Sequence, residues 1–257
     1  MWNIDLSGKT IIVSGGNRGI GQAISHQCAQ AGAHVAILYR SSEDAPEIAK
    51  GIAEKYDVRC QAFKCDVSDQ KQIHDLVRQI YHDLGPVGGM ICNAGVLVSK
   101  PAMEMTKEDF DEQFHTNVWG VFNCAQAAAS LWKEHDYKDG RIVFVSSVAA
   151  TIVNRDGNAC FYSPTKGALS MLSKSLAVEW ADQGILVNNI SPGFVDTDMN
   201  ASITQDADKK KEVESRIPLK RFSNPDEQAG MAVFLLSEYA TYATGTEMIL
   251  DGGEHIW

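Results

Sequence analysis

Three side chains suited to proton chemistry stand close together in the second half of the sequence. Tyr162 and Lys166 are four residues apart in the run Tyr-Ser-Pro-Thr-Lys, and Ser147 lies fifteen positions upstream of Tyr162. On a helix, residues i and i+4 share a face, so the spacing places an ammonium group beside the phenol. A neighbouring positive charge favours the phenolate and lowers the tyrosine pKa from its ordinary value near ~10. With the Ser147 hydroxyl holding a substrate oxygen, the set predicts proton transfer to or from that oxygen.

A fold that alternates short strands with helices must position these side chains. Apolar, β-branched runs predict strands, and the stretches between them predict helices. The expected strands are 10–14, 34–39, 59–65, 88–92, 141–146, 186–190 and 247–250. The expected helices lie near 19–31, 43–56, 69–84, 107–133, 162–182 and 225–237. This alternation implies right-handed crossovers, so we expect an α/β fold: a Rossmann-type doubly wound parallel sheet of about seven strands, with helices on both faces.

The chain is expected to form one domain over residues 1–257, because no linker, repeat or low-complexity stretch divides it. Its longest weakly patterned segment is about 192–221, which carries three consecutive lysines, Lys209 to Lys211. We name residues 192–221 the lid segment. It is either a solvated loop or a lid over a binding site, since long loops in compact domains are often functional.

The composition is ordinary for a globular protein and excludes several classes. Hydrophobic residues make up 44% of the chain, and no apolar run approaches the ~20 residues that span a bilayer. The first residues lack the basic and apolar regions of a secretory signal, and six scattered cysteines indicate free thiols in a reducing compartment, the cytoplasm. The seven histidines form no metal-binding motif, so no metal is expected. A net charge of −10 argues against nucleic acid as a partner.

A glycine-rich turn follows the first expected strand. The run from Ser14 to Gly21 reads Ser-Gly-Gly-Asn-Arg-Gly-Ile-Gly and leads directly into a helix. Glycines there permit a tight turn and a close approach of the backbone to a pyrophosphate. The helix N-terminus adds free N–H groups and the positive end of its dipole. In a βαβ context, this position favours a dinucleotide-phosphate site over a purely structural turn.

The end of the second expected strand indicates which dinucleotide binds. NAD sites usually place an acidic residue here for the ribose 2′-hydroxyl, but this chain has Arg40 and Ser41, with Arg18 nearby in the glycine turn. Two guanidinium groups suit a 2′-phosphate, so we expect NADP(H) as the cofactor. The alternative is that Arg40 is only exposed and that Glu43 or Asp44 acts as the acid.

Taken together, these motifs resemble those of the short-chain dehydrogenase/reductase family over essentially the whole chain. The resemblance rests on the glycine turn, Cys65-Asp66-Val67, Asn93-Ala94-Gly95, Asn117 in Thr-Asn-Val, Ser147, Tyr162 with Lys166, and Pro192-Gly193 followed by Val195 and Thr197. It implies an enzyme that moves a hydride between a nicotinamide and a substrate carbon. The helices near 107–133 and 162–182 resemble those that pair in the family's tetramers, so a homotetramer is expected.

The resemblance also implies a role for each site residue. Tyr162 exchanges the proton, and Ser147, rather than the adjacent Ser146, holds the substrate oxygen. Lys166 lowers the tyrosine pKa and binds the nicotinamide ribose, and Asn117 holds a water that links Lys166 to solvent. The implied cofactor-binding residues are Gly15, Asn17, Arg18, Gly19, Ile20, Gly21, Arg40, Ser41, Asp66, Val67, Asn93, Ala94, Gly95, Tyr162, Lys166, Pro192, Gly193, Val195 and Thr197. Pro164 fits this arrangement if the helix begins near Tyr162, because an early proline loses no intrahelical hydrogen bond.

Within the family, the chain resembles more closely the fungal NADP-dependent mannitol 2-dehydrogenases and related ketose reductases. The stretches that carry this resemblance are 14–21, 37–42, 83–87, 175–181 and 251–257. That similarity implies interconversion of a small-molecule sugar alcohol and a 2-ketose, D-mannitol and D-fructose first, with L-xylulose or sorbose reduction and D-arabinitol oxidation as alternatives. Reduction of a 3-oxoacyl carrier protein is less favoured, because a net charge of −10 repels an acidic carrier. A non-catalytic NADP(H) sensor would have no use for the acid–base set.

The sugar-contacting residues are not determined by the pattern. The stretch from Ser147 to Tyr162 is two residues longer than is common in the family. A polyol needs several hydrogen-bonding side chains, and two groups are available. They are Asn154, Arg155, Asp156 and Asn158 before Tyr162, and Asp196, Asp198, Met199 and Asn200 in the lid segment.

Overall fold

The computed structural model describes residues 3–153 and 158–256 and, within them, a seven-stranded parallel sheet. Its strand order is β3-β2-β1-β4-β5-β6-β7, and every neighbouring pair is parallel. The strands are β1 (Thr10–Ser14), β2 (His34–Tyr39), β3 (Cys60–Lys64), β4 (Val87–Cys92), β5 (Gly140–Val145), β6 (Ile185–Pro192) and β7 (Glu247–Leu250). The predicted α/β class and doubly wound parallel sheet are confirmed, and the predicted strands are all present within two residues of their expected ends.

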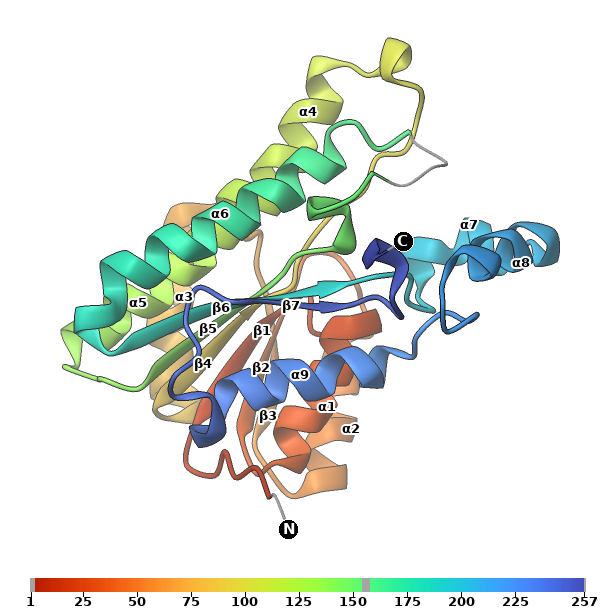
Figure 1. Cartoon of the computed structure of the whole chain (residues 1–257). Helices are drawn as coiled ribbons and strands as arrows, with labels where there is room; N and C mark the ends of the chain where they lie inside the picture. Colours follow the sequence, from red (N-terminus) through yellow and green to blue (C-terminus); the bar gives the residue numbers. More distant parts are fainter. Residues whose placement is uncertain (1–2, 154–157, 257) are drawn as a thin grey trace.

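Helices cover both faces of this sheet (Figure 1). On one face α1 (Gly19–Gln30), α2 (Ala45–Tyr56) and α9 (Pro225–Leu236) enclose one hydrophobic core. On the other face α3 (Gln70–Leu84), α5 (Val121–Glu134) and α6 (Tyr162–Trp180) enclose a second core. Strands β1, β4 and β5 lie between the two cores and are buried along their whole length, which explains their continuous apolar sequences.

The strand order reverses between β1 and β4, because the chain builds outward from β1 in one direction and from β4 in the other. In an open parallel sheet, ligands bind at this switch point, outside the carboxyl ends of the strands. The glycine turn follows β1, Asn93 follows β4 and Ser147 follows β5 shortly after its end. The topology therefore brings the predicted site residues to one edge of the sheet.

The long helix expected at 107–133 is interrupted. It consists of α4 (Lys107–Phe114), a π-helical turn (His115–Gly120) and α5. The turn contains Asn117, and π-helical turns occur frequently at functional sites. By contrast, α6 begins at Tyr162 as expected, so Pro164 lies in its first turn, where a missing N–H costs no helical hydrogen bond.

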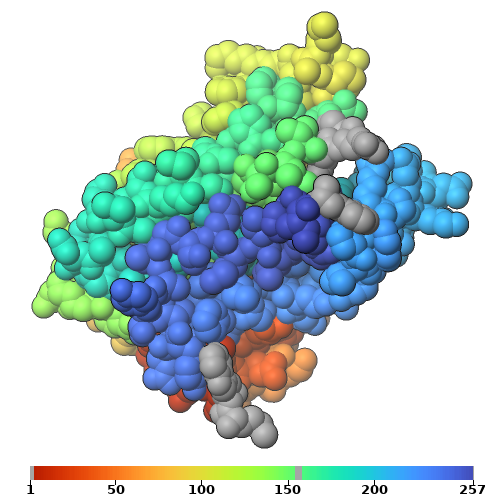
Figure 2. Space-filling model, in the orientation of Figure 1, coloured from red at the N-terminus to blue at the C-terminus, as the bar shows by residue number. Residues whose placement is uncertain are grey.

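The lid segment is more ordered than its sequence pattern indicates. It holds a 3-10 turn (Asp198–Asn200), α7 (Ala201–Thr204) and α8 (Ala207–Arg216), and in Figure 2 these light-blue residues project from the rest of the surface. The Asp206 carboxylate accepts hydrogen bonds from the first N–H groups of α8 at 3.2 and 3.1 Å. Val213 and Ile217 then pack against Phe222 in a small separate core. The polar surface of α8 hides this packing from a search for periodicity.

Candidate active site

Three predicted catalytic side chains meet beyond the carboxyl end of β5. Tyr162 is the first residue of α6, and its side chain hydrogen-bonds that of Ser147. Lys166 lies one turn further along α6, with its ammonium nitrogen 5.5 Å from the centre of the Tyr162 ring. The same ammonium donates a hydrogen bond to the backbone carbonyl of Val145 at 2.9 Å. The i, i+4 spacing thus brings the ammonium and the phenol together as the sequence predicts.

Burial governs the protonation of this pair, and one expectation is wrong. Desolvation raises the pKa of Tyr162 to about 12, against a smaller lowering by the Ser147 hydrogen bond. Desolvation also lowers the pKa of Lys166 to about 8. The tyrosine pKa was expected to lie below its ordinary value, but surroundings of low polarity disfavour the phenolate, and this desolvation dominates the net shift. The hydroxyl of Tyr162 is therefore protonated at neutral pH.

The two neighbouring serines have different surroundings. The Ser146 hydroxyl is buried and donates to the backbone carbonyl of Lys166 at 3.1 Å. Ser147 is half-buried, and its oxygen accepts a hydrogen bond from the N–H of Ala149 while its side chain contacts Tyr162. Ser146 thus fastens α6 to β5, and Ser147 is the serine available to hold a substrate oxygen.

Asn117 is fully buried behind this set. Its amide nitrogen donates to the carbonyl of Val96 at 2.9 Å and to the hydroxyl of Thr165 at 3.1 Å, and its oxygen accepts from the N–H of Val96 at 2.8 Å. A methyl group on Gly95 would lie 3.4 Å from the Asn117 amide oxygen and 3.7 Å from the Lys166 nitrogen, so these groups share one neighbourhood. Both amide hydrogens of Asn117 are therefore used within the protein.

The glycine turn has the shape of an anion cradle. Gly15 has a φ of +63°, which most side chains disfavour. A methyl group on Gly21 would lie 2.2 Å from the carbonyl oxygen of Gly15, so only glycine allows α1 to start this close to β1. No side chain caps the N-terminus of α1, and its first turn contains no acidic residue. The free N–H groups there suit a diphosphate.

Asn93 and Ala94 hold this turn in place. The Asn93 amide nitrogen donates to the carbonyls of Ser14 and Gly15 at 3.0 and 3.1 Å, and the N–H groups of Asn93 and Ala94 donate to the Ser14 hydroxyl. These bonds join the ends of β1 and β4. The Asn-Ala-Gly turn thereby supports the shape of the glycine turn as well as lying beside the expected cofactor site.

The residues expected at the adenosine end lie after β2 and β3. Arg18, Arg40 and Ser41 are exposed, and neither arginine forms an ion pair with a carboxylate in the described part of the chain. Burial raises the pKa of the Asp66 carboxyl, but hydrogen bonds from Ser68 and the nearby charge of Arg40 together outweigh it. The pKa of Asp66 therefore lies below its ordinary value. Two unpaired guanidinium groups beside the glycine turn suit a second phosphate.

The Pro192-Gly193 turn closes the other end of the site. Pro192 ends β6, and Gly193 donates its N–H to the carbonyl of Leu250 in β7 at 3.0 Å. A methyl group on Gly19 would lie 3.2 Å from the methyl carbon of Thr197, so the lid segment begins directly beside the glycine turn. Val195 is buried and pairs with Ser223 in a short parallel bridge.

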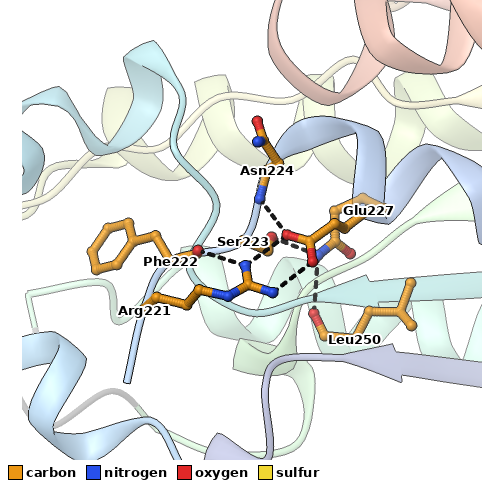
Figure 3. A network of polar contacts seen from close by, with 7 residues as sticks. Arg221, Phe222, Ser223, Asn224, Glu227 and Leu250 are labelled. Carbon is orange, nitrogen blue, oxygen red and sulfur yellow. Dashed lines mark hydrogen bonds and ion pairs between the residues drawn. The ribbon is translucent and has the colours of Figure 1, made fainter. Parts of the chain in front are cut away.

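The far end of the lid segment is fixed to α9 by an ion pair (Figure 3). Arg221 donates to both carboxylate oxygens of Glu227 at 2.7 and 2.6 Å, and this contact lowers the pKa of Glu227 to about 2. The N–H of Asn224 also donates to Glu227. Cavities of about 170 and 240 Å³ flank Arg221, but neither is lined by Ser147, Tyr162 or Lys166.

The candidate sugar contacts are placed only in part. Asn154, Arg155 and Asp156 lie outside the described residues. Asn158 offers its backbone carbonyl to the N–H of Lys100 at 3.0 Å, and Asn200 uses its side-chain amide to donate to the Val195 carbonyl at 2.7 Å. Asp196, Asp198 and Met199 are exposed. Asn200 is thus occupied within the lid segment, whereas the exposed residues there keep their side chains accessible.

Within residues 3–153 and 158–256, no three His, Cys, Asp or Glu side chains gather to hold a metal ion. None of the described helices has the length and apolar character required to cross a membrane. All six cysteines are free, and Cys160 is the exposed one.

A doubly wound sheet with a phosphate cradle at its switch point and a Ser–Tyr–Lys contact beside it defines a dinucleotide-dependent oxidoreductase that acts on CH–OH groups. The family described as enoyl-(acyl carrier protein) reductase matches residues 15–255. A short-chain type dehydrogenase/reductase from Mycobacterium marinum has the same fold, with a TM-score of 0.92 and 33% identity over 98% of each chain. The chain belongs to the short-chain dehydrogenase/reductase family.

Three relatives illustrate the range of activities nearby. An NADP-dependent mannitol dehydrogenase of Alternaria alternata is 37% identical, covering 96% of this chain and 92% of the relative. A 3-oxoacyl-[acyl-carrier-protein] reductase of Aquifex aeolicus is also 37% identical, covering 97% and 98%. A sorbose reductase of Candida albicans is 36% identical, covering 96% and 87%.

Proposed function

We propose that this protein is an NADP(H)-dependent oxidoreductase that interconverts a sugar alcohol and a 2-ketose, with D-mannitol and D-fructose as the first pair to consider. The observation that carries the chemistry is the contact of Tyr162 with Ser147 and Lys166 beside the glycine turn. The mannitol dehydrogenase and sorbose reductase among its relatives support a sugar as the substrate. Sorbose, L-xylulose and D-arabinitol remain the alternatives within this class.

The residues present fit NADP(H). The glycine turn and the free N-terminus of α1 would hold the diphosphate, and Arg18, Arg40 and Ser41 would hold the 2′-phosphate. Asp66 and Val67 would border the adenine, and Lys166 would hydrogen-bond the nicotinamide ribose. Residues Asn93 to Gly95 and the lid residues Val195 and Thr197 would line the nicotinamide end. The bound nicotinamide supplies a hydride to a carbonyl carbon or receives one from an alcohol carbon.

In the reducing direction, the Tyr162 hydroxyl donates its proton to the ketose oxygen while Ser147 donates a hydrogen bond to the same oxygen. A pKa near 12 keeps Tyr162 protonated and ready for this step. Lys166 then stabilises the phenolate that remains, because its ammonium lies against the ring. Reprotonation of Tyr162 from solvent completes the cycle, and oxidation of the polyol runs the same proton transfer backwards.

A second candidate is reduction of a 3-oxoacyl carrier protein, which the Aquifex aeolicus relative favours. Carrier proteins are acidic, and a protein of net charge −10 needs a local basic face to bind one. Two lysines of the 209–211 run are already engaged, since Lys209 and Lys210 face Asp206 and Glu214 at 3.4 and 3.9 Å. The charge balance therefore favours a small neutral substrate.

Three further features belong to the same proposal. Residues 192–221 act as a substrate lid within one domain, held at its far end by the ion pair of Arg221 with Glu227. The enzyme is a homotetramer, because Met171 and Val178 leave an apolar stripe on α6, 62% and 83% exposed. It works in the cytoplasm. Light scattering on the purified protein measures the oligomeric state, and a monomer would contradict the tetramer.

A substrate panel tests the proposal. We expect the highest kcat/KM with NADPH for a 2-ketose, with D-fructose, L-sorbose and L-xylulose assayed beside a 3-oxoacyl thioester, and with D-mannitol and D-arabinitol assayed with NADP⁺. A panel in which the thioester exceeds every ketose would instead establish the second candidate. If the protein binds NADPH but turns over none of these compounds, the proposed class of substrate would be contradicted.

A further inference from the structure

Thr165 lies between two members of the catalytic set. It is fully buried in the first turn of α6. Its hydroxyl donates to the backbone carbonyl of Tyr162 at 2.6 Å and accepts from the amide nitrogen of Asn117 at 3.1 Å. A hydroxyl carries a single hydrogen, so donation to Tyr162 leaves its lone pairs for Asn117 and fixes the direction of both bonds.

Asn117 has no freedom to replace this bond. Its second amide hydrogen and its oxygen both bond the backbone of Val96. Because Asn117 is fully buried, an amide hydrogen that lost Thr165 would be left without a protein partner. The π-helical turn is thereby held to α6 through one hydroxyl.

The bonds of Ser146 and Lys166 fasten the start of α6 to β5, but neither reaches the π-helical turn. No side chain caps the N-terminus of α6, and Pro164 has no N–H to offer. In the part of the chain that the structure describes, the Asn117–Thr165 bond is the hydrogen bond that joins the π-helical turn to α6. This first turn carries the Tyr162 ring, so a shift of the turn moves the phenol relative to Ser147 and Lys166.

We propose that Thr165 is a positioning residue, which sets the place of the Tyr162 hydroxyl through the hydrogen-bonded chain Asn117–Thr165–Tyr162. This inference rests on the proposed function only in giving Tyr162 the proton-transfer role. It does not depend on which carbonyl compound is the substrate.

Ser173 offers a matched control on the same helix. It too is fully buried, and its hydroxyl donates to the carbonyl three residues earlier, that of Ser170, at 3.1 Å. It also accepts from the amide nitrogen of Asn189 at 2.7 Å. The two hydroxyls make the same pair of bonds, but Ser173 lies two turns beyond the catalytic residues.

The test compares Thr165→Val, Thr165→Ser, Thr165→Cys and Ser173→Ala, assayed with whichever carbonyl compound in the panel has the highest kcat/KM. We expect Thr165→Val to lower kcat about tenfold to a hundredfold, with KM changed less than about threefold, since small misplacements of reacting groups have effects of this size. The pH profile of kcat should shift by about half a unit or more, because the surroundings of the phenol change. Thr165→Ser should restore both kcat and the pH profile, and Thr165→Cys should be intermediate.

Ser173→Ala should lower the melting temperature and leave kcat per folded enzyme and the pH profile unchanged.

Three results would overturn the inference. Thr165→Val could keep the wild-type kcat and pH profile, or Ser173→Ala could lose as much kcat as Thr165→Val, which would make the role purely structural. If Thr165→Val does not fold, wild-type kinetics in Thr165→Cys would likewise contradict it. A best substrate that is not a sugar would refute the proposed function and leave the Thr165 result standing.

Discussion

The ammonium nitrogen of Lys166 lies 5.5 Å from the centre of the Tyr162 ring and donates its hydrogen bond to the Val145 carbonyl. The lysine therefore acts on the phenol through its charge, while the Ser147 side chain makes the hydrogen bond to the phenol. Both ionisable groups are desolvated, so each resists its charged form. A substrate that takes the tyrosine proton creates the charge that Lys166 then compensates.

Burial of Lys166 predicts a distinctive dependence of stability on pH. Its pKa is about 8 in the folded protein and 10.5 as the reference value, so between these the unfolded chain binds more protons. The free energy of unfolding therefore rises as the pH rises through this window, and the cost of burying the charge is fully present below about 8. Relative to Lys166→Met, the wild type should gain about 2 kcal/mol between pH 7 and pH 10. Urea unfolding of both proteins at both pH values measures it, and a constant difference would contradict the lowered pKa.

Gly21→Ala should disturb the phosphate cradle. The added methyl group would lie 2.2 Å from the Gly15 carbonyl oxygen and 2.5 Å from the Asn93 amide nitrogen, so α1 must shift. We expect the Kd for NADPH to rise by about tenfold or more, because the N–H groups that face the diphosphate are displaced.

Gly51→Ala is the control, since nothing lies within 4 Å of its added methyl group on α2. That variant should bind NADPH normally and be as stable as the wild type or more so. Equal NADPH affinity in the two variants, measured by fluorescence titration, would refute this account of the turn.

Arg40→Asp should reverse the choice of cofactor. A carboxylate would repel the 2′-phosphate and accept a hydrogen bond from a 2′-hydroxyl. We expect the ratio of kcat/KM for NADPH over NADH to fall about a hundredfold, in keeping with the loss of charge-assisted hydrogen bonds. Lys50→Ser removes an exposed cation from α2 whose partner, Glu54, is 3.8 Å away, and should leave the ratio unchanged. A similar change in both variants would show that general charge, and not Arg40, sets the preference.

The adjacent serines should separate chemistry from stability. Ser147→Ala removes the hydrogen-bond donor for the substrate oxygen and should lower kcat about a hundredfold. Ser146→Ala removes the buried bond to the Lys166 carbonyl and should lower the free energy of unfolding by about 1 kcal/mol, with a smaller effect on kcat. Steady-state kinetics and denaturation of both variants decide the matter. A larger loss of kcat in Ser146→Ala would mean that the two roles have been exchanged.

The sequence predicted the sheet well because parallel strands covered on both faces leave continuous apolar runs, as in β1 and β5. It missed α8, because the buried side chain of that otherwise polar helix, Val213, packs against Phe222, a contact that only the fold makes. The sequence did offer one signal for this helix. Asp206 is a residue type that commonly caps helix N-termini, and its carboxylate accepts from the N–H of Lys209, three positions later. The π-helical turn at Asn117 was missed because a local change in hydrogen-bond register leaves no mark on hydrophobic periodicity.

Site residues in contiguous motifs were predictable, but their energetics were not. The spacing of Tyr162 and Lys166 gave their proximity, yet the direction of the tyrosine pKa shift depends on burial that the spacing does not contain. Thr165 stands inside the same motif, but the motif does not reveal its role, because that role depends on Asn117, forty-eight positions away. The tie between Asn93 and the glycine turn was hidden for the same reason.

Comparison of Tyr162→Phe with the wild type, assayed with D-fructose and NADPH, tests the central claim most directly. The substitution removes the hydroxyl and leaves the ring beside Lys166, so NADPH should bind with an unchanged Kd. We expect kcat to fall about a thousandfold, the scale of general acid catalysis with a positioned group. A Tyr162→Phe enzyme that reduces the ketose at the wild-type rate would contradict the account.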